Sequence, residues 1–316
     1  MRVGILDNLQ AGGGGAFAVR SWARRRDDLR VVESADLSAL DEACRVLEQD
    51  GCDVWLINGG DGTLQHVLTA LLRDPDRTAL PALAPLRGGR TNMTSRDLGA
   101  DRKPVRGAER LLDALASGDL AGHRVERPVL RVESARRGAP LYGFFFGAGL
   151  IYRAIRWVHQ HFPPRHGQGV AGAGLMTATL LGRMLGGQRE GLLAPDKCSV
   201  WQEEHLIGDG EQRLVIATSL DRLFLGLEPF WAEGTGAVRL TALASDTPSL
   251  ARATPAILRG RRRAEFTPEN GFTSVRGEAI DLRIDCGFTI DGELFAPLGD
   301  ETIRIGADRR IGFLRA

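Results

Sequence analysis

The residues best suited to chemistry form a short stretch with three glycines. Residues 58–63 read Asn-Gly-Gly-Asp-Gly-Thr and lie between the apolar run Val54–Ile57 and a helical pattern that starts at Leu64. In such a strand–turn–helix the first N–H groups of the helix point at the turn, and glycines let an anion approach them closely. Asp61 can take a magnesium-bound water or a hydroxyl proton, and Thr63 can cap the helix or donate to a phosphate. The stretch predicts phosphate handling.

The alternative interpretation is an ordinary connection, which has little reason to bear the flexibility cost of three glycines. The stretch is not a P-loop, because no G-x-x-x-x-G-K-[ST] pattern occurs and no lysine follows the run Gly12–Gly15. Lys103 and Lys197 are the two lysines among 41 basic residues. A mechanism that needs a dedicated phosphate-binding lysine therefore has few candidates.

The elements that must position this stretch alternate in the first third of the chain. This alternation is typical of a parallel sheet with crossover helices. Strands are expected over residues 2–6, 29–33, 54–58 and 82–86, and helices over residues 16–24, 38–50, 64–72 and 104–117. Ser38 and Asp41 are the predicted capping pair of the second helix.

From about residue 120 the pattern changes to strands with hairpin turns, such as an expected strand over 199–206 that returns through 207–210 to 213–219. We predict an α/β domain with a parallel sheet over residues 1–120, on which the segment 300–316 packs, and an antiparallel β-sandwich domain over residues 121–299. Helices are expected over 152–159 and 170–185.

The turn at residues 58–63 resembles the nucleotide-binding turn of the diacylglycerol kinase catalytic family, which includes sphingosine, ceramide and bacterial lipid kinases, with NAD kinases as distant relatives. Asn8-Leu-Gln-Ala-Gly12 resembles the family's first turn, Asn-Pro-x-Ser/Ala-Gly. Residues 85–92, Pro-Leu-Arg-Gly-Gly-Arg-Thr-Asn, resemble its Pro-Leu-Gly-Thr-Gly-Asn turn, and residues 291–293 resemble its Asp-Gly-Glu motif. The resemblance spans almost the whole chain.

The resemblance implies a two-domain lipid kinase that holds ATP between its domains and transfers the γ-phosphoryl group to a lipid hydroxyl, with ATP and Mg²⁺ as cofactors. The cofactor-binding residues that it implies are Asn8, Gly59, Gly60, Gly62, Thr63, Gly89, Arg90, Thr91 and Asn92. The implied catalytic residues are Asp61, which would also serve the metal, and the pair Asp291 and Glu293, which would complete the base or nucleotide contacts across the cleft.

The sequence departs from the family pattern in three places. Leu9 replaces the proline of the first turn, and Arg90 and Thr91 replace the family's Thr-Gly. Arg90 can contact phosphate through its planar fork or lie solvated in a loop, and both interpretations stay open. Residues 233–237, Glu-Gly-Thr-Gly-Ala, lack the second acidic position of a stretch that helps to hold a structural magnesium in bacterial members, so no structural metal is predicted.

Two alternative functions remain at this stage. A NAD kinase-like small-molecule kinase would share the Gly-Gly-Asp-Gly turn, although residues 226–229 and 291–293 favour the lipid branch. A non-catalytic lipid- or nucleotide-binding protein on the kinase scaffold is disfavoured by the retained Asp61 and Glu293, because a binder needs no acids beside a phosphate cradle. The sequence does not identify the lipid.

Several segments keep two interpretations. The apolar segment 170–185 is either buried core or the entrance for an apolar substrate. Arg259-Gly-Arg-Arg-Arg263 is either a solvated helix end or a membrane-surface patch. His159, His161 and His166 flank a Pro-Pro break, which favours a surface loop over a metal site.

The composition sets the remaining limits. A chain of 316 residues with 43% apolar and 26% charged residues is typical of a two-domain globular protein, and a net charge of +1 gives no reason to expect nucleic acid. Four cysteines without a C-x-x-C pair favour free thiols in a reducing compartment. No apolar run reaches the ~18 residues of a membrane span. We expect a cytoplasmic protein, with peripheral contact at the inner membrane surface and a homodimer left open.

Overall fold

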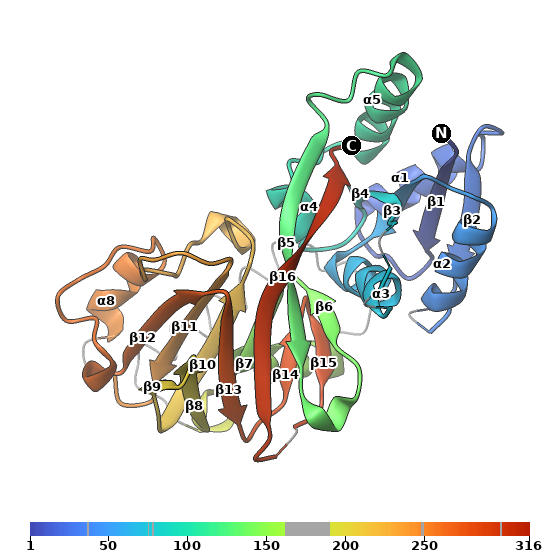
Figure 1. Ribbon diagram of the computed structural model, residues 1–316. Coiled ribbons are helices and arrows are strands. Elements are labelled where there is room, and N and C mark those ends of the chain that lie inside the picture. The colour runs from blue at the N-terminus through green and yellow to red at the C-terminus, as the bar shows by residue number, and fades with distance from the viewer. Residues whose placement is uncertain (37, 75, 78, 162–189, 248–249, 298) are drawn as a thin grey trace. The chain divides into compact units, whose positions relative to one another are not determined.

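The computed structural model describes residues 1–36, 38–74, 76–77, 79–161, 190–247, 250–297 and 299–316 (Figure 1). The chain divides into two compact units. The first holds Met1–Arg127 and Arg310–Ala316, and the second holds the described residues from Pro128 to Arg309. The predicted helix over 170–185 and His166 lie outside the described residues.

The first unit contains a parallel sheet with the strand order β4-β3-β1-β2. Its strands are β1 (Val3–Asn8), β2 (Arg30–Ser34), β3 (Val54–Gly59) and β4 (Ala82–Arg87). The parallel sheet confirms the predicted fold class of this half. Because the strands are parallel, the turns that follow β1, β3 and β4 lie at one edge of the sheet.

Helices cover both faces of this sheet (Figure 1). They are α1 (Gly14–Ala23), α2 (Leu40–Gln49), α3 (Asp61–Leu72), α4 (Met93–Asp97) and α5 (Pro104–Ser117). On one face Val19 of α1 and Leu111 of α5 share a buried cluster with Ile5 of β1. On the other face α2 packs so closely that a Cβ atom on Gly4 would lie 2.5 Å from Leu47. Every residue of β1 and β3 is buried, which explains their continuous apolar runs.

The predicted capping pair of α2 is wrong. The N-cap residue of α2 is Ala39, and it makes no side-chain cap hydrogen bond. Asp36 instead accepts a hydrogen bond from the backbone N–H of Ala39 at 3.0 Å and from the hydroxyl of Ser38 at 2.6 Å. An Asx-type bond within the preceding turn therefore replaces the predicted contact.

The second unit is built from antiparallel strands. They include β7 (Phe145–Gly149), β8 (Asp196–Gln202), β9 (His205–Gly208), β10 (Glu211–Thr218), β11 (Val238–Ala244), β12 (Phe272–Gly277), β13 (Ala279–Ile284), β14 (Phe288–Ile290) and β15 (Glu293–Phe295). A short strand, β6 (Leu141–Gly143), pairs with the long strand β5 (Arg124–Glu133). The predicted strand over 199–206 is itself a hairpin, because β8 turns at Glu203 and pairs with β9.

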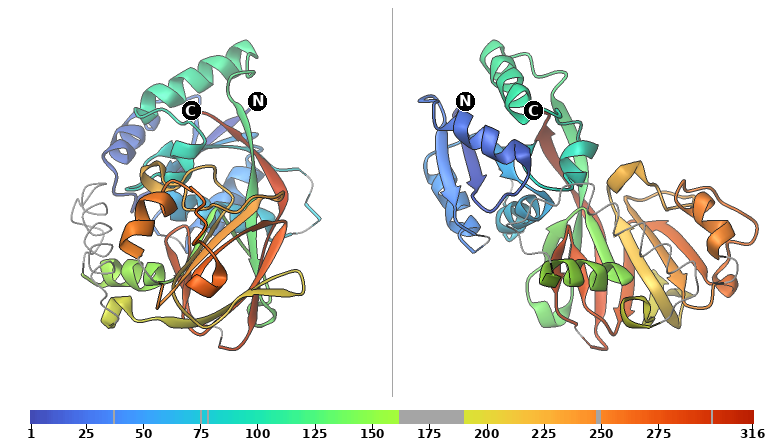
Figure 2. Two further views of the ribbon diagram at one scale, coloured as in Figure 1. Left: turned by 90° about the vertical axis from the view of Figure 1, so that its left-hand side faces the viewer. Right: turned by 180° about the vertical axis from the view of Figure 1, so that it is seen from behind.

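Two sections of antiparallel sheet share one core, as predicted for a sandwich. Side chains of β7, β10 and β11 from one section and of β8, β13 and β16 (Thr302–Leu314) from the other form a single buried cluster. Strand β16 pairs with β13 through its first residues and with β4 at Phe313. Figure 2 shows β16 and β5 running side by side, in agreement with their pairing.

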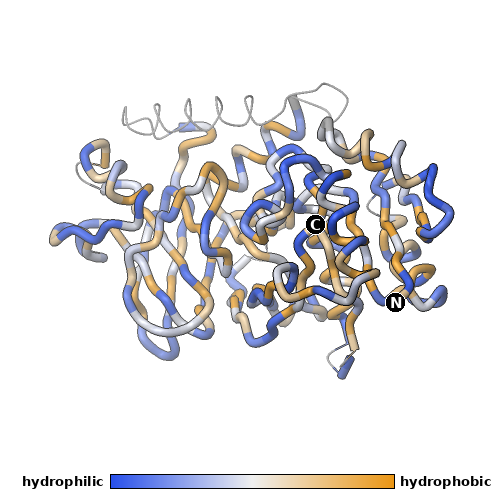
Figure 3. The backbone as a smooth tube through the Cα atoms, turned by 90° about the horizontal axis from the view of Figure 1, so that it is seen from above, coloured by the Kyte–Doolittle hydropathy of each residue, from blue (hydrophilic) through white to orange (hydrophobic). Residues whose placement is uncertain are grey.

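The second unit also carries α6 (Leu150–His161), which confirms the helix expected over 152–159, and α8 (Leu250–Ile257). Figure 3 shows short hydrophobic stretches alternating with hydrophilic ones along the backbone. Among the described helices, none is long and apolar enough to cross a membrane.

Candidate active site

Three glycine turns meet at the edge of the parallel sheet. They follow β1, β3 and β4, and Gly13 donates its backbone N–H to the carbonyl of Gly88 at 3.1 Å. A Cβ atom on Gly13 would lie 2.4 Å from the oxygen of Gly89, and one on Gly89 would lie 2.4 Å from the Cα of Gly60. Because any side chain would collide with backbone at these distances, the three turns can approach each other only as glycines.

Two helices begin at these turns without side-chain caps. Gly13 is the N-cap of α1 and Gly60 is the N-cap of α3, and neither helix start receives a side-chain cap hydrogen bond. The first N–H groups of a helix have no partner within the helix, and the helix dipole adds partial positive charge there. Both starts can therefore donate to an anion such as a phosphate.

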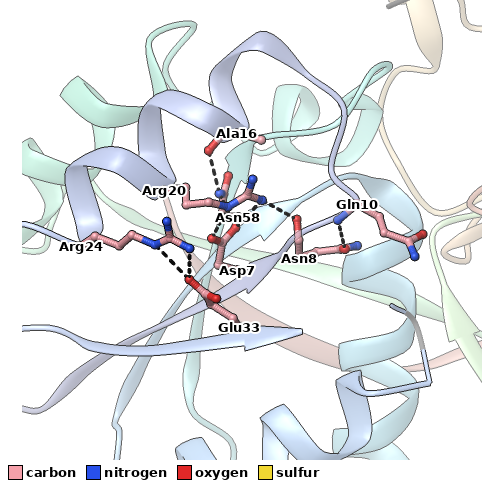
Figure 4. A network of polar contacts seen from close by, with 8 residues as sticks. All are labelled: Asp7, Asn8, Gln10, Ala16, Arg20, Arg24, Glu33 and Asn58. Atoms are coloured by element: carbon pink, nitrogen blue, oxygen red, sulfur yellow. Dashed lines mark hydrogen bonds and ion pairs between the residues drawn. The ribbon is translucent and has the colours of Figure 1, made fainter. Parts of the chain in front are cut away.

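A buried polar network holds β1, β3 and α1 beneath the turns (Figure 4). Arg20 of α1 pairs with the carboxylate of Asp7, which is 1% exposed, at 2.6 and 3.1 Å. Asn58 donates to the Oδ1 of Asp7 at 2.8 Å and to the carbonyl of Ala16 at 3.0 Å. The network fixes the start of α1 relative to the ends of both strands, since a buried charge is retained only with such partners.

A second set of contacts ties the first turn to α3. The side-chain N–H of Asn8 donates to the hydroxyl oxygen of Thr63 at 2.9 Å, and the Oδ1 of Asn8 accepts from the N–H of Gln10 at 2.9 Å. Gly59 is required beside Thr63, because a Cβ atom there would lie 2.5 Å from the threonine side chain. Thr63 is thus buried and bonded to Asn8. Of the two roles left open for it, the capping role is excluded because α3 has no side-chain cap hydrogen bond.

Asp61 links the second turn to the third. Its Oδ2 accepts hydrogen bonds from the hydroxyl of Thr91 at 2.8 Å and from the N–H of Met93 at 3.0 Å, and its Oδ1 accepts from the N–H of Thr94 at 2.9 Å. A carboxylate at a helix start is favourable for the dipole of α4. Asp61 therefore caps α4 from outside the helix.

Asn92 shapes the third turn from within. Its backbone is left-handed, with φ of 50°, a conformation in which asparagine is several-fold enriched. Its side chain accepts from the N–H of Gly89 and donates to the carbonyl of Gly89, both at 2.7 Å. The turn that approaches Gly60 is thus closed by a side chain three residues further along.

Among the predicted site residues at this edge of the sheet, Asp61 could supply a magnesium ion with one ligand oxygen. Magnesium in nucleotide sites is usually held by one or two carboxylates together with substrate phosphates. The hydrogen bonds to Asp61 occupy most of its lone pairs and leave capacity mainly on Oδ1. Asp61 would therefore hold such an ion through one oxygen or a bridging water, and the ion would neutralise phosphate charge.

The other predicted acids lie in the second unit, in the hairpin of β14 and β15. Asp291 and Gly292 form its two-residue turn with φ of 49° and 95°, as type I′ turns require. The buried carboxylate of Asp291 accepts from the N–H of Phe144 and from the N–H of Phe145, each at 2.9 Å. Asp291 therefore joins the hairpin to the first residues of β7.

Glu293 is the second acidic residue of this hairpin. It opens β15 and is partly buried, and burial raises the pKa of its carboxyl. A carboxyl with a raised pKa lies closer to the range in which a group can exchange protons near neutral pH. Glu293 is accordingly a candidate for proton transfer.

The predicted cofactor-binding residues all lie in the first unit, and hydrogen bonds or backbone contacts join Asn8 to Thr63, Asp61 to Thr91 and Gly60 to Gly89. Four residues that build the site were not among the predicted site residues. They are Asp7, Gly13, Asn58 and Gly88. Gly13, Asn58 and Gly88 lie within the quoted motifs, and the signal for Asp7 was a polar residue at the end of a buried strand.

Several solved structures share the fold of this chain. Among solved structures, a candidate diacylglycerol kinase from Bacillus anthracis matches with a TM-score of 0.68 and 15% identity, covering 100% of this chain and 97% of the other. A second diacylglycerol kinase structure from that organism matches with a TM-score of 0.64 and 16% identity, covering 100% of this chain and 97% of the other. An NAD kinase from Archaeoglobus fulgidus in complex with ATP matches with a TM-score of 0.51 and 12% identity, covering 100% of this chain and 94% of the other. The chain thus has the two-domain fold of diacylglycerol and NAD kinases.

A family match covers most of the first unit. Residues 12–121 match the family model of the diacylglycerol kinase catalytic domain. This segment holds the second and third glycine turns together with Asp61 and Asn92, so the match covers the part of the chain that forms the candidate site. The recognition made from the motifs is confirmed. A search of curated proteins found no match.

Proposed function

We propose that this protein is an ATP-dependent lipid kinase that transfers the γ-phosphoryl group of ATP to a lipid hydroxyl. The observation that carries the proposal is the convergence of Gly13, Gly60 and the Gly88–Gly89 turn around two uncapped helix starts. The first N–H groups of such helices have no partner within the helix and suit a polyphosphate. The family of residues 12–121 supports the choice of a kinase.

In this mechanism the chain supplies position and charge. Phosphoryl transfer needs alignment of donor and acceptor, neutralisation of phosphate charge and a group that takes the hydroxyl proton. The helix starts of α1 and α3 would hold the phosphates, and Asp61 would keep the third turn in place and bind a magnesium-bound water. Magnesium, when bound, neutralises phosphate charge. Glu293 would take the proton, and Asp291 would hold its hairpin.

A NAD kinase-like activity is the second candidate. The similarity of the fold to the Archaeoglobus fulgidus NAD kinase favours it, at a lower TM-score than the diacylglycerol kinase structures. A third candidate is a non-catalytic nucleotide- or lipid-binding protein. The engagement of Asp61 by three donors favours that role, because a bonded carboxylate can be purely structural.

One assay separates the three candidates. Purified protein is incubated with γ-labelled ATP and magnesium, and with a panel of detergent-dispersed diacylglycerol, monoacylglycerol, ceramide and sphingoid base, or with NAD. Labelled lipid is the expected product. Labelled NADP without labelled lipid would replace the proposal with the NAD kinase candidate. ATP binding without transfer to any acceptor would favour the non-catalytic role.

A further inference from the structure

The end of α8 and the turn before β11 form a surface that the proposed phosphate chemistry does not use. Residues 250–263 contain five arginines and no acidic residue. The turn Leu223–Leu227 lies beside them, because Glu228 donates its N–H to the carbonyl of Leu258 at 3.1 Å. A Cβ atom on Gly260 would lie 2.6 Å from the oxygen of Glu228, so the two segments are in close contact. We call these residues together the arginine–leucine surface.

The positive charge of this surface is only partly neutralised. Arg222 is paired with Glu228 at 2.9 Å, and Arg263 lies 3.5 Å from Glu265. The exposed side chains of Arg261 and Arg262 make no hydrogen bond or ion pair among the described residues. An exposed cluster of arginines without acidic partners is complementary to a surface of negative charge.

An apolar side chain is displayed beside this charge. Leu225 is 51% exposed, and its backbone is left-handed, with φ of 60° and ψ of 12°. This conformation is uncommon for leucine, which lacks the local hydrogen bonds that make it tolerable for asparagine. The turn is closed by bonds from Leu223 to Leu227 and from Gly226 to Leu223, at 2.8 and 2.9 Å. The chain therefore holds a leucine outward in an unfavourable conformation where a polar residue would fit better.

We propose that the arginine–leucine surface docks the protein on an anionic lipid bilayer. Arginines near such a bilayer gain electrostatic attraction to the headgroups, and an exposed leucine gains by leaving water for the acyl boundary. A free anion or a nucleic acid would use the arginines but would gain nothing from Leu225. The inference deepens the proposed function, because a kinase whose acceptor is a bilayer lipid must reach the bilayer.

The test is sedimentation of the full chain with vesicles, without ATP. Vesicles contain phosphatidylcholine alone or with roughly one third phosphatidylserine, and the wild type should bind the anionic vesicles at least ~10-fold more tightly. Arg261→Gln with Arg262→Gln should weaken that binding by ~25-fold, about fivefold for each arginine. The matched control, Arg25→Gln with Arg45→Gln, removes the same charge from exposed positions of the first unit and should bind as the wild type does.

Leu225→Asn tests the apolar contact separately. Asparagine tolerates the left-handed backbone, so the unfolding temperature should stay the same or rise while vesicle binding falls severalfold. Equal binding of both vesicle types, or wild-type binding by the double arginine variant, would overturn the proposal. Retention by duplex nucleic acid without vesicle binding would do the same.

The two proposals fail in different ways. Vesicle binding needs no phosphoryl transfer, so protein that binds anionic vesicles but labels no lipid counts against the kinase proposal alone. The double arginine variant should keep the wild-type rate on detergent-dispersed lipid, because the arginines lie outside the glycine turns. Labelled lipid in detergent from a wild type that ignores vesicle charge counts against the docking surface alone.

Discussion

The two Asp-Gly turns of this protein resemble each other in sequence and differ in what their glycines do. In both, an aspartate carboxylate accepts hydrogen bonds from two backbone N–H groups of another segment: Asp61 holds the start of α4, and Asp291 holds the entrance of β7. Gly60 lies against a second glycine turn, whereas a Cβ atom on Gly292 would meet nothing within 4 Å. The turn at Asp61 uses glycine for close approach to another turn. The turn at Asp291 uses glycine only because its backbone has φ of 95°.

This difference separates a site that must remain open to a ligand from a hairpin that only orients a side chain. The close approach of three turns in the first unit leaves helix-start N–H groups without side-chain caps. In the hairpin of the second unit, the polar groups of the turn are used to hold the chain. We expect substitutions in the turn at Gly60 and Asp61 to act mainly on nucleotide binding and phosphoryl transfer. Substitutions of Asp291 should act mainly on stability.

The largest expected effect is on turnover. Asp61→Asn keeps the size of the side chain and removes its charge, so phosphoryl transfer should fall by ~10²- to 10⁴-fold in a labelled-ATP assay. Thr91→Val is the matched variant, because it removes one hydrogen bond to Asp61 and leaves the carboxylate charged. It should reduce turnover much less. If Asp61→Asn and Glu293→Gln both keep full lipid phosphorylation, the roles proposed for these acids are wrong.

The next effect is on nucleotide affinity. A Cβ atom on Gly60 would lie 3.2 Å from the Cα of Gly89, so Gly60→Val pushes the two turns apart. Overpacking of this kind costs ~1–3 kcal/mol, and the ATP dissociation constant should rise roughly 10- to 100-fold in titration calorimetry. Gly312→Val is the control, because that exposed strand position has nothing within 4 Å. Unchanged affinity in Gly60→Val would make the turn a simple connection.

A smaller effect is expected on stability from the turn at Asp291. Asp291→Asn leaves one acceptor oxygen for the N–H groups of Phe144 and Phe145, and one buried donor loses its partner. The free energy of unfolding should fall by about 1–3 kcal/mol in urea denaturation. Asp246→Asn, at an exposed position, gives the reference for a surface change. A loss no greater than that of the reference would show that the bonds of Asp291 do not stabilise the hairpin.

The smallest effect concerns the pH dependence of stability at Glu293. Burial raises the pKa of this carboxyl in the folded protein, so its ionised form opposes folding. The stability present below the ordinary pKa of a glutamate is therefore lost as the pH rises through the folded pKa. Glu293→Gln should therefore be more stable than the wild type at pH 7, with the difference vanishing at acid pH.

Glu269→Gln supplies the opposite sign for comparison. Hydrogen bonds from the backbone N–H of Glu269 itself and from Thr267 lower the pKa of that exposed carboxyl, so its charged form favours folding and the variant should be less stable near neutral pH. Thermal unfolding of both variants across a pH series provides the measurement. A pH-independent difference for Glu293→Gln would contradict a buried, pKa-shifted carboxyl.

The local pattern of the chain was sufficient for the elements of the first unit. The helix predicted over 104–117 has the bounds Pro104–Ser117, because its apolar stripe, its proline at the first turn and Gly118 after its end are all local signals. The strand–turn–helix at residues 54–72 was likewise predicted from its apolar run and glycines. Predictions failed where two local partners competed, as in the cap of α2 and the hairpin of β8 and β9.

Only the tertiary structure decided which residues share the site. Asp61 bonds to residues 30 to 33 positions further along the chain, and Asn58 bonds to Asp7 at a separation of 51. Those partners are set by the parallel register of β1, β3 and β4, which brings three distant turns to one edge of the sheet. A one-dimensional pattern identifies a residue that can carry charge or leave space for a ligand. It does not tell whether that charge is already bonded, because the answer depends on strands that pair across the whole unit.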